Sequence, residues 1–158
     1  MTVRWWGSGE IPSNEPRYVR IAACALCVED GRLLLARVST GYAEAGAWTL
    51  PGGGLEFGER PETGVLRELE EECGLRGETG ALLAIDSQVY GPRAGRDGHL
   101  LALRIIYRVR VTGGELRNER DGSTDECSWV ALVDVPALPL VPLAEVGLRL
   151  ARAELKAV

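Results

Sequence analysis

The stretch that decides the fold is residues 53–75, GGLEFGERPETGVLRELEEECGL. Pro61 suits the first turn of a helix, and Gly74 suits the left-handed position just beyond a helix end. The stretch therefore predicts a helix over residues 61–73 that follows a glycine-rich loop. At 3.6 residues per turn, one face of this helix is apolar and is predicted to pack on the core. That face consists of Val65, Leu66, Leu69 and Cys73.

Three glutamates form a ridge beside the apolar face. Glu68, Glu71 and Glu72 are spaced i, i+3 and i+4, which places them on one side of the helix. Like charges at this spacing repel one another, and a solvated acidic face is the simplest explanation of most such patterns. Here the ridge borders the core, follows a glycine-rich loop, and has a further acid, Glu59, just before the helix. Clustered carboxylates near backbone oxygens are ligands of hard divalent cations, so the ridge predicts a site for Mg²⁺ or Mn²⁺.

Nine positions within residues 53–75 resemble, in residue type and spacing, the sequence box of the Nudix (MutT-like) hydrolases. They are Gly53, Glu59, Arg67, Glu68, Leu69, Glu71, Glu72, Gly74 and Leu75. The resemblance implies an α+β fold, a Nudix-type α/β/α sandwich with a mixed β-sheet and the box as loop-helix-loop. It also implies a hydrolase that cleaves a pyrophosphate bond in a nucleoside diphosphate linked to another moiety.

The resemblance also implies how the box would hold a metal ion. Glu71 and Glu72 would be ligands, and Glu68 would be either a ligand or the general base that activates water. The backbone carbonyl of Gly52 (or Gly53) would be a further ligand. The chemistry agrees, because an acidic site can accept pyrophosphate oxygens only through bridging cations, which also acidify bound water.

Other box residues would support the reaction. By the same resemblance, Arg67 would orient the glutamates through charge-assisted hydrogen bonds, so Glu68, Arg67 and Glu71 are the predicted catalytic residues. Glu59 would hold the loop or join the outer metal shell. Gly53 and Gly74 would have structural roles in the loop and at the helix end.

Outside the box, a carboxylate near the end of the chain resembles one that reaches the metal site in this family. Glu126, three residues before Trp129, is the predicted ligand, although Asp125 competes for the role and a turn acid is an equal alternative.

Four side chains are predicted to bind substrate. Arg37 and Arg104 would hold a phosphate, with ion-paired strand positions as the alternative. Trp48 and Tyr90, with Trp129 as a further candidate, would stack on a base, although strand aromatics are more often part of a core.

The rest of the chain predicts more strands than helices. Asp30-Gly31 indicates a hairpin turn, and Gly113-Gly114 is expected to turn the chain again. The predicted strands are residues 18–29, 32–38, 47–50, 81–90, 99–112 and 126–133, and a final amphipathic helix covers residues 142–156. Because no regular crossover helices separate the strands, a doubly wound parallel sheet is disfavoured.

The 158 residues suit one domain. We divide the chain into an N-terminal arm, residues 1–16, and a single Nudix hydrolase domain, residues 17–158. The arm contains Trp5-Trp6, which either packs back on the domain or covers a neighbouring subunit, so a homodimer stays open.

Composition and charge exclude several classes of protein. The net charge of −5 gives no sign of a cationic face for nucleic acid or an anionic membrane. No apolar run approaches the ~18 residues of a spanning helix, and the N-terminus lacks the apolar region of a secretory signal. The four cysteines are therefore predicted to be reduced thiols in a cytoplasmic protein. Cys24 and Cys27, three apart on a strand, point to opposite faces and suit no shared metal.

The substrate itself stays open. A nucleoside triphosphate, a dinucleoside polyphosphate or a nucleotide sugar would fit the box equally well. Two other functions are alternatives: hydrolysis of a non-nucleotide diphosphate, and binding of a nucleotide without cleavage. The intact box favours catalysis over binding alone.

Overall fold

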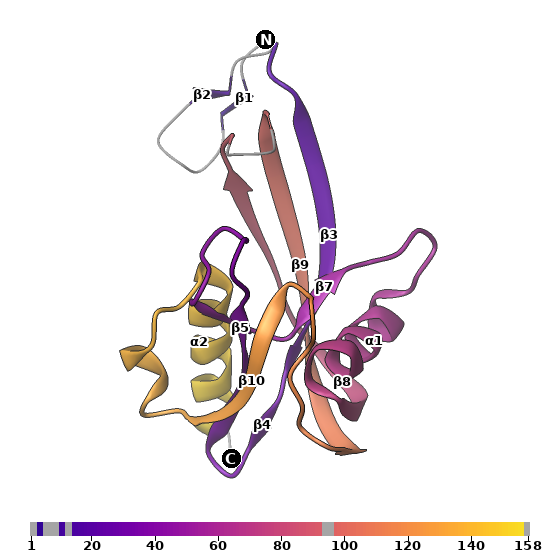
Figure 1. Cartoon of the computed structure of the whole chain (residues 1–158), viewed down its shortest axis with the longest axis vertical. Helices are drawn as coiled ribbons and strands as arrows, with labels where there is room; N and C mark the ends of the chain where they lie inside the picture. Colours follow the sequence, from indigo (N-terminus) through magenta and orange to yellow (C-terminus); the bar gives the residue numbers. More distant parts are fainter. Residues whose placement is uncertain (1–2, 5–9, 12–13, 93–96, 157–158) are drawn as a thin grey trace.

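Two β-sheets lie between two helices in the computed structural model of the chain, which describes residues 3–4, 10–11, 14–92 and 97–156 (Figure 1). One sheet has the order β7-β3-β9-β8, in which β3 and β9 are parallel and the other pairs antiparallel. The other has the order β10-β5-β4, and β6 also pairs with β5. The predicted α+β sandwich with a mixed sheet is confirmed.

The elements have the following bounds. The first sheet contains β3 (Arg17–Leu26), β7 (Gly52–Gly54), β8 (Leu75–Tyr90) and β9 (His99–Gly114), and the second contains β4 (Val28–Glu29), β5 (Arg32–Val38), β6 (Trp48–Thr49) and β10 (Thr124–Ala131). The helices are α1 (Pro61–Cys73), the short 3-10 helix η1 (Val135–Ala137) and α2 (Pro142–Lys156). Before β3, the two-residue strands β1 (Val3–Arg4) and β2 (Glu10–Ile11) pair with each other.

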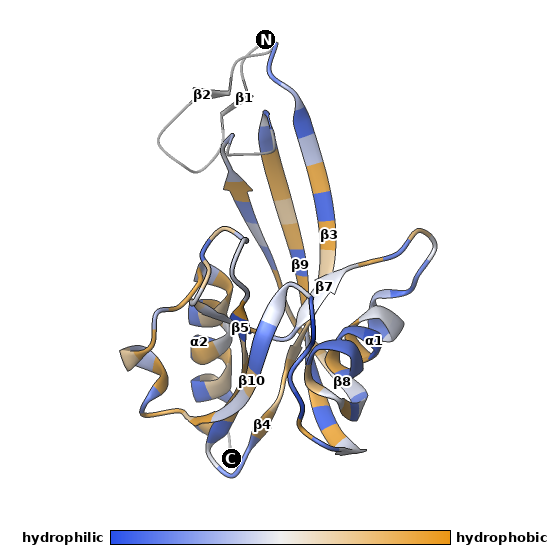
Figure 2. Ribbon diagram, viewed as in Figure 1, coloured by the Kyte–Doolittle hydropathy of each residue, from blue (hydrophilic) through white to orange (hydrophobic). Residues whose placement is uncertain are grey.

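The core consists of two apolar clusters on opposite sides of the strands. Leu26, Leu35 and Ile106 pack toward α2, whereas Leu34 and Tyr107 pack toward α1. Polar and apolar residues mix only in the first part of β3, as Figure 2 shows, and the strand is apolar from Ile21 to Leu26. Because successive strand side chains point to opposite faces, Cys24 and Leu26 join one cluster and Ala23 and Ala25 the other. The same geometry separates the thiols of Cys24 and Cys27, which lie in different clusters and are both free and buried, as predicted.

Both long helices, β5 and the Asp30-Gly31 hairpin lie where the sequence predicted them. The prediction of a turn at Gly113-Gly114 is wrong, because β9 continues through both glycines and pairs Gly114 with Leu75. Gly114 has a φ of 89°, and a Cβ there would overlap the carbonyl oxygen of Gly74. The glycines therefore allow close approach of two strand ends. The loop before α1 also differs, since Gly52–Gly54 forms β7 against β3.

The prediction that all four cysteines are reduced is wrong for two of them. Cys73 at the end of α1 and Cys127 in β10 form a disulfide, with their Cα atoms 5.6 Å apart. The pairing was hidden in the sequence because the two residues are 54 positions apart. The cytoplasmic location, which was predicted together with the reduced thiols, stays a prediction.

No helix in the described part of the chain is long and apolar enough to cross a membrane. The roles predicted for Trp5 and Trp6 concern residues outside the described ranges.

Candidate active site

Helix α1 carries the glutamate ridge, Glu68, Glu71 and Glu72, along the edge of the core. Pro61 occupies its first turn, and Gly74, with a φ of 70°, ends it by donating its N–H to the carbonyl of Glu70 at 2.9 Å. Burial increases across the ridge: the Glu71 side chain is 54% exposed, that of Glu68 15%, and Glu72 as a residue only 3%. The ridge therefore borders the core, as the sequence predicted, and of its three carboxylates only that of Glu71 is largely solvated.

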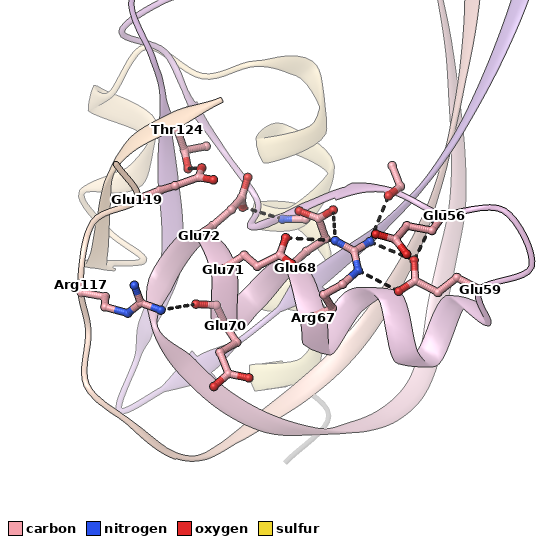
Figure 3. A network of polar contacts seen from close by, with 12 residues as sticks. Glu56, Glu59, Arg67, Glu68, Glu70, Glu71, Glu72, Arg117, Glu119 and Thr124 are labelled. Carbon is pink, nitrogen blue, oxygen red and sulfur yellow. Dashed lines mark hydrogen bonds and ion pairs between the residues drawn. The ribbon is translucent and has the colours of Figure 1, made fainter. Parts of the chain in front are cut away.

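Arg67 binds acids from both the loop and the helix of the box (Figure 3). Its Nε and Nη2 donate to the two carboxylate oxygens of Glu59 at 2.8 and 2.9 Å. Its Nη1 donates to Glu68 at 2.8 Å and to Glu71 at 3.0 Å, and Nη2 also reaches the carbonyl of Gly54 at 3.2 Å. The hydrogen bonds from Arg67 lower the pKa of Glu59 to about 2. Arg67 thus ties the box loop to the helix and orients two ridge carboxylates.

Glu72 is a buried carboxylate for which no described lysine or arginine provides an ion pair. Burial raises its pKa to about 8, and the negative charges of Glu68 and Glu119 add to this effect. The backbone N–H of Gly52 donates to its Oε2 at 2.9 Å and lowers the pKa in part, as does a hydrogen bond with Ser123. Burial also raises the pKa of Glu68. Such carboxylates gain most from a nearby cation, because it repays their lost hydration.

Gly53 faces the Glu68 carboxylate directly. A Cβ at residue 53 would lie 2.5 Å from the carboxylate carbon and Oε2 of Glu68. Only glycine leaves that space to the carboxylate. This gives a physical basis to the structural role predicted for Gly53.

A pocket of about 400 Å³ opens beside the ridge. Gly52, Gly53 and Glu72 form its wall on the side of the box. The strands β3, β9 and β8 and the loops after β5 and before β10 supply most of the remaining lining: Arg20, Ala22, Cys24, Tyr42, Tyr90, Leu100, Ala102, Arg104, Ser123 and Thr124. The structure therefore brings Tyr90 and Arg104, both predicted to bind substrate, to one cavity with the box.

The other residues predicted to bind substrate or metal from outside the box do not line the pocket. Arg37 donates to Asp125 at 2.8 Å and lies 2.7 Å from the Glu126 carboxylate, so both candidate late ligands are paired with one arginine. The Arg37 guanidinium also lies over Trp48, 5.9 Å from the ring centre. Trp48 belongs to the core at 9% exposure and is not part of the pocket lining, so little of its ring is open to a base. Trp129 is half-buried and packs against the core on the α1 side.

Sequence reasoning missed several residues at the site. Glu119, which precedes β10, raises the pKa of Glu72 and accepts a hydrogen bond from Thr124 at 3.2 Å. Arg20 on β3 lines the pocket. For Arg20, the available signal was its spacing: Ala22 and Cys24 follow it by two and four residues, which places all three on one face of the strand. The loop position of Glu119 carried no periodic signal.

The donor set fits a hard divalent cation, because it consists of carboxylate and carbonyl oxygens. Among the described residues, no three His, Cys, Asp or Glu side chains already converge as a metal cluster. Arg67 holds Glu68 and Glu71 instead, through the same Nη1 atom. A metal ion would therefore compete with Arg67 for those two carboxylates, whereas Glu72 has no described cation to give up.

Comparison with known proteins identifies the family. Residues 17–150 match the model of the NUDIX domain. The chain belongs to the Nudix family. The resemblance seen in the box is therefore confirmed, and the matched segment includes the ridge, the pocket lining and most of α2.

Two relatives show which named proteins this Nudix chain resembles in sequence. It is 53% identical over 102 residues to a MutT-like protein of Streptomyces ambofaciens, a match that covers 65% of this chain and 56% of the relative. It is 31% identical over 118 residues to an ADP-ribose pyrophosphatase of Methanocaldococcus jannaschii, covering 75% of this chain and 65% of the relative. The chain thus spans less than two thirds of the length of either relative.

A solved structure shares the fold more completely. The MutT NUDIX hydrolase from Burkholderia pseudomallei superimposes with a TM-score of 0.68 at 33% identity, and the match covers 83% of this chain and 96% of that one.

Proposed function

We propose that this Nudix domain is a metal-dependent pyrophosphohydrolase. Its substrate would be a nucleoside diphosphate linked to another moiety: a nucleoside triphosphate, a dinucleoside polyphosphate or a nucleotide sugar. The observation that carries the proposal is the position of Glu72, a buried carboxylate without a described cationic partner at the wall of a pocket. Pyrophosphate oxygens could approach this acidic wall only through a bridging cation.

Glu68, Glu71 and Glu72 would hold Mg²⁺ or Mn²⁺, with the carbonyl of Gly52 as a further ligand. The metal would supply acidified water and stabilise charge on the leaving phosphate. Glu68, whose side chain is 15% exposed, would either bind the ion or remove a proton from the attacking water. Arg67 would keep Glu68 and Glu71 oriented in the absence of metal.

Tyr90 and Arg104 are proposed to contact the nucleoside part of the substrate, since both line the pocket. Glu126 enters the proposal as a further ligand that would first have to leave Arg37, and Arg37 would then be released toward a phosphate. The predicted stacking of a base on Trp48 receives no support, because the Trp48 ring lies in the core.

The test is hydrolysis of a panel of nucleoside triphosphates, dinucleoside polyphosphates, nucleotide sugars and ADP-ribose with Mg²⁺, in which released phosphate and nucleoside monophosphate are measured. ADP-ribose is included because a relative is named for it. Glu72→Gln and Glu71→Gln should each lower the rate at least about 100-fold, as expected when a metal ligand is lost. Glu70→Gln is the matched control, because Glu70 is exposed on the same helix outside the box pattern. Turnover of non-nucleotide diphosphates alone, or nucleotide binding without turnover, would overturn the proposal.

We infer that residues 17–158 form the catalytic domain of a cytoplasmic enzyme acting on small-molecule nucleotides. The arm, residues 1–16, is the candidate contact with a second copy of the chain. Light scattering of the chain with and without the arm tests that role, and a dimer that persists without the arm would remove the arm from the interface.

A further inference from the structure

Two arginines on the floor of the pocket differ in how their charges are compensated. Arg20 on β3 and Arg104 on β9 lie on the same face of the sheet, because β3 pairs with β9 in parallel with Arg20 opposite Ala102 and Ala22 opposite Arg104. Both side chains line the pocket next to the box. The small residues between them, Ala22 and Ala102, leave the floor hollow.

Arg104 is neutralised by an ion pair with Asp86. It is 7% exposed and forms an ion pair with Asp86, the residue directly opposite on β8. Its Nη1 donates to the Tyr90 hydroxyl at 3.2 Å. Its Nε is buried and has no hydrogen-bond partner among the described residues. A buried N–H without a partner is costly, so this donor is available to an acceptor atom of a ligand.

Arg20 is the opposite case. It is exposed, and its guanidinium forms no ion pair with any carboxylate in the described part of the chain. It lies along Gly54, whose Cβ position would be 3.2 Å from the Arg20 Nε, and its charge is felt by Glu68. Arg20 thus places a positive charge without a described ion-pair partner at the pocket, near enough to act on Glu68.

We propose that these two arginines divide the recognition of the substrate, an inference that rests on the function proposed above. Arg20 binds the phosphate that stays on the nucleoside. The Nε of Arg104 donates to a neutral acceptor atom of the base, which lies on the floor formed by Ala22, Leu100 and Ala102. Arg104 is unsuited to the phosphate, because Asp86 already neutralises it and would repel an anion.

The experiment is calorimetric titration of the full chain, with saturating Mg²⁺, using the four common nucleoside monophosphates and the matching nucleosides. The proposed reaction does not cleave these probes. Arg20→Ala should weaken the monophosphates about 10-fold to 100-fold, the usual value of a charged hydrogen bond, and leave the nucleosides within about 2-fold. Arg104→Lys keeps a cation beside Asp86 but removes Nε, and it should weaken nucleoside and monophosphate by the same factor, about 10-fold, and flatten the preference among bases.

Arg149→Ala, on the exposed side of α2, is the control for loss of a surface arginine and should change nothing. Equal losses for nucleoside and monophosphate in Arg20→Ala, or unchanged nucleoside binding in Arg104→Lys, would overturn the division of roles. If the wild-type chain binds none of the monophosphates, the pocket is not a nucleotide site and the inference fails. The hydrolysis panel decides the proposed function independently, because it measures phosphate release from substrates of every class.

Discussion

Arg67 binds both carboxylate oxygens of Glu59, with Nε–Oε1 and Nη2–Oε2 distances of 2.8 and 2.9 Å. Glu59 also accepts the backbone N–H of Glu56 at 3.0 Å, so one carboxylate joins the loop to the helix. Bidentate pairs of this kind fix geometry as well as charge. Because the pair fixes the Arg67 guanidinium, Arg67 can hold the ridge carboxylates of Glu68 and Glu71 in place despite their like charges.

Loss of this pair should destabilise the protein in a pH-dependent way. The pKa of Glu59, about 2, is below its ordinary value of 4.5, so ionised Glu59 stabilises the folded state above about pH 4.5. This contribution is lost as the pH falls toward 2. Glu59→Gln should therefore lower the melting temperature at neutral pH, and the gap from wild type should close at low pH. Thermal unfolding across this range measures it, with exposed Glu29→Gln as control; a gap that persists at low pH would contradict the assignment.

Glu72 should have the reverse effect on stability in the absence of metal. Its folded-state pKa, about 8, is above the ordinary value of 4.5, so folding is penalised increasingly as the pH rises from 4.5 to 8. In EDTA, Glu72→Gln should be more stable than wild type at pH 8, by roughly 1–4 kcal/mol, and equal to it near pH 4.5. Mn²⁺ should then stabilise wild type but not the variant. Denaturant unfolding at the two pH values measures both effects, and a variant less stable at pH 8 would refute the predicted penalty.

Much of the box could be predicted because its information is local. Pro61 and Gly74 set the helix bounds, and the i, i+3, i+4 spacing placed Glu72 beside the core without reference to other segments. The pocket could not be predicted in this way. Arg20 and Arg104 are more than eighty residues apart in sequence, and only the parallel pairing of β3 with β9 puts them on one floor.

The late carboxylate shows a second limit of the sequence. Glu126 was chosen by its distance from Trp129, but β10 turns it and Asp125 toward Arg37 on the neighbouring strand. Glu119 had no periodic signal and yet acts on Glu72 through its charge.

This contrast leads to a prediction about metal affinity. Glu119→Gln should weaken Mn²⁺ binding more than Glu126→Gln, because Glu126 is neutralised by Arg37 at 2.7 Å whereas Glu119 adds negative potential at Glu72. We expect a loss of about 3-fold to 10-fold for Glu119→Gln, in line with a single nearby charge. Titration of the chain with Mn²⁺ measures both variants. The opposite order would show that Glu126 leaves Arg37 and contributes more to metal binding than Glu119 does.

Gly53→Ala should impair the site without unfolding the chain. The added Cβ would occupy the space of the Glu68 carboxylate, which would have to move from its position beside Arg67. We expect weaker Mn²⁺ binding and at least about 10-fold lower turnover, since small misplacements of catalytic groups are costly. Gly91→Ala is the control, because a Cβ there meets nothing within 4 Å. Unchanged metal binding in Gly53→Ala would show that Glu68 does not need this space.

The disulfide between Cys73 and Cys127 should contribute to stability. It closes a segment of 54 positions and joins the end of α1 to β10. The chain-entropy model gives about 4 kcal/mol for a loop of this length. Reduction should therefore lower the free energy of unfolding by an amount of this order, measured with denaturant with and without a reducing agent.

Titration of thiols in the unfolded chain should find two in the oxidised protein, Cys24 and Cys27, and four after reduction. Cys127→Ser is the matched control, because reduction should not destabilise it further. Four thiols before reduction, or equal stability of the oxidised and reduced wild type, would contradict the disulfide as a stabilising link between α1 and β10.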